Sequence, residues 1–287
     1  MRIGVHVSAA GGYPRAAEYA RDVGAECVQL FAKSPRQWRA PALSAEKAAT
    51  LAPALESAGV RPAFTHTAYL INLGTTDDAL RERSIAALAD EIVRAELLGA
   101  AAVVTHLGTA PDGPMRAAPR IATGIAAAFS ASGTSRVRLL LENTAGAGTT
   151  FGSTPEELGD VLASLPDDAR DRTGVCLDTC HAWAAGLDLS DPEGWRAVID
   201  RFEVACGAGV IELVHANDCA YALGSRKDRH AWIGDGAIGS GGFAAMFAET
   251  RLTAACAVME MPGEAPFKDA ENISRLKALR ASSPGAA

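Results

Sequence analysis

The 287-residue sequence has no excess of positive charge and no long uninterrupted apolar segment. Its 27 lysines and arginines are outnumbered by 34 aspartates and glutamates, which gives a formal net charge of -7. The composition therefore lacks the basic footprint that usually accompanies nucleic-acid binding. No window approaches the roughly 18 consecutive apolar residues that a membrane-spanning helix requires, which argues against a helical membrane protein.

The sequence also has little that would mark a secreted protein. Residues 1–6 lead directly into a strand-like segment, without the charged stretch and the apolar core of a signal peptide. Six cysteines are spread along the chain, several within apolar runs, where a free cysteine packs as a small hydrophobe. Cys176 and Cys180 are spaced unlike the CxxC pairs of structural zinc sites. We therefore expect a soluble, cytoplasmic protein with buried cysteines and no disulfide framework.

A recurring unit is present, made of a helical stretch, a glycine turn and a short apolar run that ends in a polar residue. Gly24, Gly59 and Gly99 stand where three of these helices would end in a left-handed cap. The sequence TPEE at 154–157 predicts a capped helix start, and residues 77–98 have the apolar period of an amphipathic helix. Alternating strand and helix signals are typical of a parallel sheet.

Eight apolar runs can be counted, and eight is the number of strands in a TIM barrel. The runs are Ile3 to His6, Cys27 to Phe31, Pro62 to His66, Ala102 to His106, Val137 to Glu142, Gly174 to Asp178, Val210 to His215 and Cys256 to Glu260. With 48% hydrophobic and 21% charged residues, the chain has the composition of one large globular domain. We predict a single (β/α)8 TIM barrel of the α/β class over residues 1–280 and a short flexible tail at 281–287.

The last six of the eight runs all end in a residue that can bind a metal ion. At intervals of 36 to 45 positions, these residues are His66, His106, Glu142, Asp178, His215 and Glu260. Because all strands of a parallel barrel end on the same face, the six side chains would converge where barrel active sites are built. One such residue alone is usually a hydrogen-bonded core residue or a helix cap. Six in succession would be costly to bury without bound cations, which favours a metal site.

Three further candidate ligands lie in the loops that follow these strands, namely His181, Asp228 and His230. Histidine and carboxylate ligands together suit zinc or a similar transition metal better than magnesium or calcium. Nine ligands are too many for a single ion. The sequence therefore predicts a site with more than one metal ion.

Several segments, in order from the first strand almost to the last, resemble the endonuclease IV family of abasic-site endonucleases. They are HVSAAGG (6–12), RQWRA (36–40), HTAYLINLG (66–74), LENTAG (141–146), GVCLDTCHAWAAG (174–186), HANDC (215–219), GSRKDRH (224–230) and GDGAIG (234–239). The resemblance implies three divalent metal ions, in the first place zinc, with manganese or iron as alternatives that accept the same ligands.

The resemblance also implies how the nine ligands are divided. The first ion would be bound by His66, His106 and Glu142. The second would be bound by Glu142, Asp178, His215 and Glu260. The third would be bound by His181, Asp228 and His230. Glu142 would therefore bridge two ions, and Glu142 and Glu260 are the carboxylates that we predict to be catalytic.

The activity that the resemblance implies is DNA-repair hydrolysis. The enzyme would cut the phosphodiester bond 5' to an abasic site in double-stranded DNA, leave a 3'-hydroxyl and a 5'-deoxyribose phosphate, and act in base excision repair. Removal of 3'-blocking groups is implied as a second activity. Three dications would bring the formal charge of -7 to about -1 and make the site itself attractive to DNA, which answers the objection from the acidic composition.

Contacts to DNA are predicted in loops at the barrel mouth. Recognition of a missing base requires an opened duplex whose gap is filled by side chains. The residues expected to contact DNA are Arg36, Gln37, Tyr69, Leu70, Arg226 and Arg229. Without the resemblance, an exposed Tyr-Leu pair would be interpreted as loop packing and the arginines as solvated surface charge.

The sequence departs from the family pattern beside three of the ligands. Thr67 follows His66 where a carboxylate is common, which removes a side chain that could orient the histidine. Leu107 stands where the family often has proline, and Met261 follows Glu260. His6, the one histidine outside the ligand set, is expected to orient the floor of the site, with Trp38 and Trp183 packed around it.

Two other functions remain open at this stage. A sugar isomerase or epimerase of the same barrel class would also gather histidines and carboxylates around metal ions, and the fold alone does not separate the two. A non-catalytic binder of damaged DNA would keep the fold and lack turnover. The group formed by His181, Asp228 and His230 favours the endonuclease over the isomerase, and the intact Glu142 and Glu260 argue against loss of turnover. We expect a monomer without an obligate protein partner.

Overall fold

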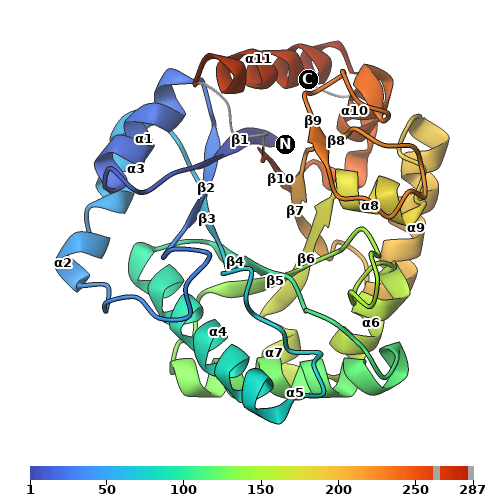
Figure 1. Cartoon of the computed structure of the whole chain (residues 1–287). Coiled ribbons are helices and arrows are strands. Elements are labelled where there is room, and N and C mark those ends of the chain that lie inside the picture. Colours follow the sequence, from blue (N-terminus) through green and yellow to red (C-terminus); the bar gives the residue numbers. More distant parts are fainter. Residues whose placement is uncertain (261–265, 284–287) are drawn as a thin grey trace.

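The computed structural model describes residues 1–260 and 266–283 of the chain. Within these residues, eight parallel strands close into a barrel in the order β1-β10-β7-β6-β5-β4-β3-β2, surrounded by helices (Figure 1). The first strand therefore pairs with the last, and all other neighbours are consecutive in the barrel. The predicted TIM barrel is confirmed.

The elements have the following bounds. The barrel strands are β1 (Arg2–Val7), β2 (Cys27–Phe31), β3 (Ala63–His66), β4 (Ala102–Thr105), β5 (Arg138–Glu142), β6 (Thr173–Asp178), β7 (Ile211–His215) and β10 (Cys256–Met259). The longer helices are α1 (Tyr13–Asp22), α3 (Leu51–Ala58), α4 (Asp78–Leu98), α5 (Pro114–Ser132), α6 (Pro155–Ser164), α9 (Pro192–Cys206), α10 (Gly239–Ala248) and α11 (Pro266–Ser282). Shorter pieces are α2 (Ala45–Ala48), α7 (Asp167–Arg170), α8 (Thr179–Ala185), the 3-10 turn η1 (Thr250–Leu252), β8 (Asp218–Cys219) and β9 (His230–Ala231).

The strand ends fall within one residue of the predicted ligands. Four strands have a predicted ligand as their last residue, namely His66 in β3, Glu142 in β5, Asp178 in β6 and His215 in β7. The other two strands, β4 and β10, end one residue before His106 and Glu260. The six side chains therefore start from one face of the barrel, as expected from parallel strands.

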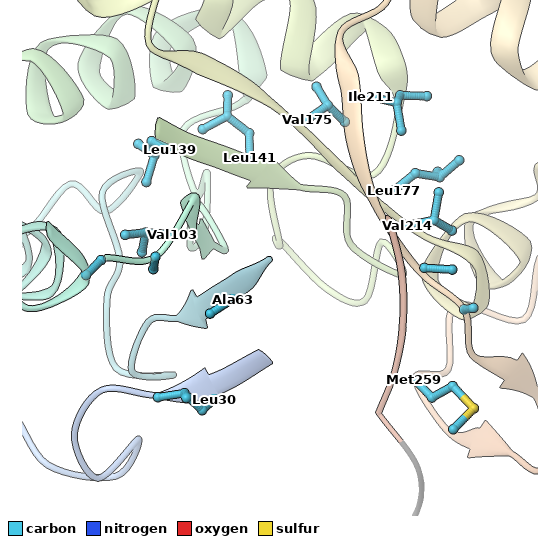
Figure 2. Packing of buried hydrophobic residues seen from close by; sticks show 14 of the residues in the cluster. Leu30, Ala63, Val103, Leu139, Leu141, Val175, Leu177, Ile211, Val214 and Met259 are labelled. Carbon is cyan, nitrogen blue, oxygen red and sulfur yellow. The ribbon is translucent and has the colours of Figure 1, made fainter. Parts of the chain in front are cut away.

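Side chains along each strand alternate between two cores. Outward-facing residues such as Leu139, Leu141 and Val175 pack toward the helices (Figure 2). Inward-facing residues form a smaller cluster that consists of Cys27, Phe64, Ala102, Val104, Leu140, Cys176, Leu213, Cys256 and Val258. Because successive side chains point to opposite faces, the inward position that follows this cluster on six strands is the predicted ligand. The ligands thus form the top layer of the barrel interior, above an apolar floor.

The predicted helix signals act as expected. Asp77 caps α4 and Thr154 caps α6, each accepting a hydrogen bond from the backbone N–H three residues further on. Gly59 and Gly99 follow α3 and α4 with φ of 70° and 67°, a left-handed conformation that other residues adopt at a cost. These caps set the points at which the chain leaves each helix and turns back into the next strand.

The last helix fastens the end of the chain to its beginning. Arg280 donates from both terminal nitrogens to the Glu26 carboxylate, and from one of them to the Met1 carbonyl at 2.8 Å. α11 continues to Ser282, two residues beyond the predicted end of the domain, and the Ser283 hydroxyl donates to the Ala244 carbonyl at 3.0 Å. Met261 and residues 284–287 of the predicted tail lie outside the described residues.

Two expectations from composition can be compared with the structure. All six cysteines are buried and none forms a disulfide, as expected for core residues. Among residues 1–260 and 266–283, no helix has the length and apolar character needed to cross a membrane.

Candidate metal centre

The first predicted group of ligands is assembled at the mouth of the barrel. His66, His106 and Glu142 offer ligand atoms that all lie within 4.8 Å of one another. Glu142 Oε2 is 2.9 Å from His66 Nε2 and 3.3 Å from His106 Nε2. Two imidazoles and one carboxylate at these separations suit a transition-metal ion, which binds such atoms at about 2.0–2.2 Å.

A second group shares Glu142 with the first. The ligand atoms of Glu142, Asp178, His215 and Glu260 also lie within 4.8 Å of one another. His215 Nδ1 is 3.1 Å from Glu142 Oε1 and 3.2 Å from Glu260 Oε2. One oxygen of Glu142 therefore faces the first group and the other faces the second, which is the geometry of a bridging carboxylate. Such a pair of sites suits the in-line displacement of a phosphate ester.

The third predicted group is connected through Asp228. Its Oδ2 atom is 3.2 Å from His181 Nε2, and its Oδ1 atom is 3.4 Å from His230 Nε2. Two neighbours extend the group, because Asp178 lies within 4.8 Å of the two histidines and Cys180 within 4.8 Å of Asp228 and His230. Cys180 is buried, as the sequence analysis expected, but its position next to these ligands was not predicted.

A short hairpin brings the third group to the barrel. β8 and β9 pair antiparallel, with Cys219 opposite His230, and they enclose the loop 220–229 that carries Asp228. The Asp218 carboxylate holds the following turn, accepting hydrogen bonds from the backbone N–H groups of Gly234, Gly236 and Ile238. The hairpin was not predicted, since two-residue strands have no periodic signal.

Burial and charge act in opposite directions on the carboxyl groups of the centre. Burial works to raise the pKa of Glu142, but His106 and His215 hold that pKa well below its usual value. The pKa of Glu260 is also lowered despite burial, whereas burial raises the pKa of Asp178. Buried ionised carboxylates require compensating positive charge, which protons on the histidines or bound cations can supply.

The histidines divide into two kinds. Burial lowers the pKa of His106 to about 4, so this side chain is neutral near neutral pH and ready to act as a ligand. Burial also works against protonation of His66, His181 and His215, but neighbouring carboxylates raise the pKa of each. Metal ions that bind these three histidines would displace protons, so binding should weaken as the pH falls.

The outer nitrogens of three histidines are held by backbone carbonyls. The distances are 2.9 Å from His66 Nδ1 to the Thr67 oxygen, 3.0 Å from His181 Nδ1 to the Asn143 oxygen and 2.7 Å from His230 Nδ1 to the Glu260 oxygen. Such contacts fix the tautomer that leaves Nε2 free for a metal ion. The backbone of Thr67 therefore orients His66, which the sequence analysis expected to lack an orienting carboxylate.

Within residues 1–260 and 266–283, two ligand nitrogens have no hydrogen-bond partner. His106 Nδ1 and His230 Nε2 are both buried and unpaired. A buried nitrogen of this kind needs an explanation, and an ion supplies one for His230 Nε2, which faces Asp228. Together with the mixed nitrogen and oxygen donor set, this observation fits divalent transition metals. Leu107, which stands where the family often has proline, is fully buried next to His106 and packs in the core.

Three amide side chains support the ligands and were not predicted, namely Gln29, Asn143 and Asn217. The Asp178 N–H donates to Asn143 Oδ1 at 2.7 Å, and Asn217 Nδ2 donates to Asp178 Oδ2 at 2.6 Å. Asn217 Oδ1 accepts from the Glu260 N–H at 2.8 Å. A signal was available for Gln29, which is the one polar residue in the apolar run CVQLF and occupies an inward position.

A cavity of about 400 Å³ lies over the three groups. Its walls include ligands from all three groups together with His6, Phe31 and Tyr69. A second cavity, of about 510 Å³, adjoins it at His6 and Phe31. Seven of the nine predicted ligands, all except Asp178 and His215, therefore line a cavity at the mouth of the barrel, where barrel enzymes bind substrates.

The residues predicted to contact DNA lie in two separate regions of the surface. Arg36, Gln37 and Tyr69 are exposed, and the Tyr69 N–H donates to the Pro35 carbonyl at 3.1 Å, which ties their two loops together. Leu70 is half-buried. Arg226 and Arg229 are exposed on the loop between β8 and β9.

Of the two tryptophans predicted to pack around the site, Trp183 is hydrogen-bonded to the loop that carries a predicted ligand, whereas Trp38 packs against α4. Trp38 is partly buried, with the Arg83 guanidinium 4.5 Å from its ring. Trp183 is buried, and its Nε1–H donates to the Tyr221 carbonyl at 3.0 Å, which anchors the loop of the third group. His6 belongs to none of the four ligand groups found in the described part of the chain, in agreement with its expected supporting role.

Proteins named endonuclease 4 are similar to this chain in sequence, and a solved endonuclease IV shares its fold. The family model described as "Xylose isomerase-like TIM barrel" matches residues 17–280. "Probable endonuclease 4" of Methanoculleus marisnigri is 38% identical over 278 residues, which cover 96% of this chain and 98% of that protein. "Probable endonuclease 4" of Chloroflexus aurantiacus is 36% identical over 97% of this chain and 98% of its own length.

Solved structures agree with the sequence relatives. Endonuclease IV from Thermus thermophilus superposes with a TM-score of 0.87 at 38% identity, covering 99% of this chain and 100% of that one. A D-tagatose 3-epimerase-like protein superposes with a TM-score of 0.71 at 16% identity, which shows a shared fold alone. The identity and the near-complete coverage establish that the chain belongs to the endonuclease IV family of the xylose isomerase-like TIM barrels.

Proposed function

We propose that this protein is a metal-dependent DNA-repair hydrolase that cuts the phosphodiester bond 5' to an abasic site. The products would be a 3'-hydroxyl and a 5'-deoxyribose phosphate, and removal of 3'-blocking groups would be a second activity of the same centre. The observation that carries the proposal is the set of nine ligand residues in three adjoining groups under one cavity. Its context is a chain whose relatives are named endonuclease 4.

The residues of the three ligand groups have the following proposed roles. Glu142 holds the first two groups together through its two oxygens, and Glu260 completes the second group. His181, Asp228 and His230 form the third group beside them. When bound there, three divalent ions supply a hydroxide at neutral pH and neutralise the charge that develops on a phosphate. No protein side chain then needs to act as the nucleophile.

Zinc is our proposal for the metal, with manganese or iron as alternatives. Five histidine nitrogens and four carboxylates make up the nine ligands, and zinc binds both types at similar distances. Manganese and iron accept the same donors, so the donor set alone does not select among them. Three ions per chain follow from the three groups.

Abasic DNA would be held by residues on both sides of the cavity. Tyr69 lines the cavity and stacks edge-on against Phe31, with the ring centroids 5.5 Å apart, so it is a rigid group beside the ligands. We propose that Arg36, Gln37, Tyr69 and Leu70 occupy the gap left by the missing base. Arg226 and Arg229 would contact backbone phosphates, which carry no sequence information but position the duplex.

A sugar isomerase of the same barrel class is the alternative. Its support is the fold that this chain shares with proteins such as the D-tagatose 3-epimerase-like protein. The third group of ligands argues against a sugar isomerase. Such an enzyme acts on neighbouring hydroxyl and carbonyl groups of one sugar, which the metal sites of the first two groups could already bind. The relatives at 36–39% identity argue the same way.

The test is an incision assay on a duplex oligonucleotide that carries one abasic analogue, without added magnesium and with a chelator control. We expect a single cut on the 5' side, a 3'-hydroxyl end and loss of cutting after chelation. Metal content measured on the same sample should be about three ions per chain. Glu142→Ala and Glu260→Ala should both abolish incision.

Two results would reject the proposal. Absence of incision at full metal occupancy would exclude the endonuclease, and ketose epimerisation by the same sample would establish the alternative. Tight binding of abasic DNA without incision would identify a non-catalytic damage binder. The monomeric state and the cytoplasmic location stay predictions, and light scattering of the purified protein would test the first of them.

A further inference from the structure

Gln29 is an uncharged side chain that contacts three residues in and beside the metal centre. It is fully buried on β2 and faces the barrel interior, at the inward position that follows Cys27. Its Oε1 is 2.9 Å from His215 Nε2, and its Nε2 is 2.8 Å from Glu260 Oε1 and 2.9 Å from His6 Nδ1. One amide therefore contacts a predicted ligand histidine, a predicted ligand carboxylate and the one histidine outside the ligand set.

The orientation of this amide is set by Glu260. A carboxylate oxygen only accepts hydrogen bonds, so the group that approaches Glu260 Oε1 must be the NH2 end of Gln29. The carbonyl end then faces His215, and this oxygen can only accept. His215 must consequently carry a proton on Nε2, which leaves Nδ1 as the atom that can bind a metal ion. His215 Nδ1 is the nitrogen that faces Glu142 and Glu260.

The same NH2 group determines the state of His6. Gln29 Nε2 lies 2.9 Å from His6 Nδ1, whereas Glu260 Oε1 lies 3.3 Å from that nitrogen. Two N–H groups pointing at each other across 2.9 Å would repel, so Gln29 donates and His6 Nδ1 accepts. A histidine that accepts at Nδ1 carries its proton on Nε2. It cannot bind a metal ion through either nitrogen while this arrangement lasts.

His6 Nε2 has no partner in the described part of the chain. The atom is buried, and His6 lines both the 400 Å³ cavity over the metal centre and the adjoining 510 Å³ cavity. A buried N–H group without an acceptor is costly, unless a bound molecule satisfies it. The acceptor must come from the contents of the cavities, and the proposed substrate offers anionic phosphate oxygens.

We infer that Gln29 is a positioning residue that fixes the tautomers of two histidines with one amide. It makes His215 a ligand through Nδ1, and it makes His6 a neutral N–H donor to a phosphate oxygen of the bound DNA backbone. The inference rests on the proposed function for the identity of that oxygen. The part that concerns His215 rests on the metal centre alone.

The roles proposed for His215 and for His6 can be tested separately by two substitutions. Gln29→Met keeps the size of the side chain and removes all three hydrogen bonds. His6→Phe keeps a ring of similar size but removes the Nε2–H donor, and it leaves the contacts of Gln29 with His215 and Glu260 in place. Asn272→Leu is the control, because Asn272 is a buried amide with hydrogen bonds to the Ile233 N–H and the Lys268 carbonyl, away from the ligands.

The first measurement is the zinc affinity of each variant, determined by competition with a chelating dye. We expect Gln29→Met to weaken the binding of one of three ions by about 10- to 100-fold, the usual effect of removing a group that orients a ligand. His6→Phe and Asn272→Leu should keep three ions bound with affinities within about threefold of the parent protein. Unchanged zinc affinity in Gln29→Met would overturn the assignment for His215.

The second measurement is the tautomer of each histidine, read from long-range proton–nitrogen correlations in zinc-loaded protein with labelled histidine. In the parent protein, His215 and His6 should both carry the proton on Nε2, and His6→Phe should leave the His215 tautomer unchanged. This variant should also raise KM for abasic DNA, and the inhibition constant for inorganic phosphate, by about 10-fold at constant metal content. A His6 proton on Nδ1 in the parent protein would overturn the role proposed for His6.

These readouts distinguish failure of the inference from failure of the proposed function. Zinc affinity and histidine tautomers are measured without DNA, so they test Gln29 even if the protein does not cut an abasic duplex. If Gln29→Met does not fold, the histidine tautomers of the parent protein still test both roles. A His215 proton on Nδ1 in place of Nε2 would contradict the role proposed for Gln29, and His6→Phe still tests the N–H donor.

Discussion

Replacing Glu142 by glutamine should remove two of the three metal sites at once with almost no change in volume. The Glu142 carboxylate is 1% exposed, and four histidine nitrogens lie between 2.9 and 3.4 Å from its oxygens. A glutamine cannot carry the charge, and its NH2 group must face nitrogens that are protonated in the metal-free protein. Removing one partner of a buried ion pair costs about 3–5 kcal/mol, and we expect a loss of that order in the free energy of unfolding after chelation.

The metal-loaded variant should bind about one ion in place of about three. Glu142 belongs to the first and second groups, whereas His181, Asp228 and His230 do not depend on it for ligand atoms. The assays are urea unfolding of chelator-treated protein near neutral pH and elemental analysis of the zinc-loaded protein. Incision of abasic DNA should fall to the background of the chelated parent protein.

Glu91→Gln is the matched control. Glu91 is also 1% exposed, but it lies on α4 outside the ligand groups, and burial raises its pKa to about 7. Glu91 Oε1 lies 3.6 Å from Lys33 Nζ, but this ammonium keeps a closer partner in Asp90, at 2.7 Å. A neutral glutamine therefore replaces a carboxyl group that is already partly protonated near neutral pH and leaves Lys33 paired, so the cost should stay below about 1 kcal/mol. Three bound ions in Glu142→Gln, or equal losses of stability in the two variants, would refute the argument for a shared bridging carboxylate.

Three other outcomes are expected. In chelator-treated protein, the pKa of His106 is about 4 in the folded state and 6.5 in the unfolded state, so the unfolded state binds the proton more tightly. The free energy of unfolding should therefore fall by about 3 kcal/mol, relative to His106→Asn, as the pH drops from 6.5 to 4. The same pH dependence of urea unfolding in both proteins would contradict this. Tyr69→Ala should raise KM for abasic DNA about 10-fold with unchanged metal content, and an equal effect on an intact duplex would rule out a role at the gap. Arg226→Ala with Arg229→Ala should lower the slope of log affinity against log salt by about 1.8 in filter-binding experiments, and an unchanged slope would exclude phosphate contacts.

The ring of ligands could be predicted because two simple periodicities determine it. Parallel strands end on one face of the barrel, and side chains alternate along each strand, so polar strand ends at regular intervals must meet. His66 and Glu142 therefore lie 2.9 Å apart although 76 positions separate them in sequence. Tertiary proximity followed from topology in this case, without any local signal that links the two residues.

The supporting groups could not be predicted in the same way. Asn143 and Asn217 are uncharged and follow strand ends, and nothing in such an amide distinguishes a group that orients a ligand from one that faces solvent. Gln29 had only the signal of a polar residue within an apolar run, which does not say what it contacts. Thr67 shows the same limit, because its orienting group is a backbone carbonyl that any residue provides. The thiol of Cys180 reaches the third group only because β8 and β9 fold the loop back, and two-residue strands leave no pattern in the sequence.

The pairing of β1 with β10 has a consequence for the order of events during synthesis. A ribosome releases His66, His106 and Glu142 when half of the chain has been made, whereas Glu260 follows the last strand. Closure of the barrel and completion of the second ligand group thus depend on the same late segment. A nascent or truncated chain that ends before β10 lacks Glu260 and can present only part of the candidate metal centre, so metal loading of the second group would belong to the final step of maturation.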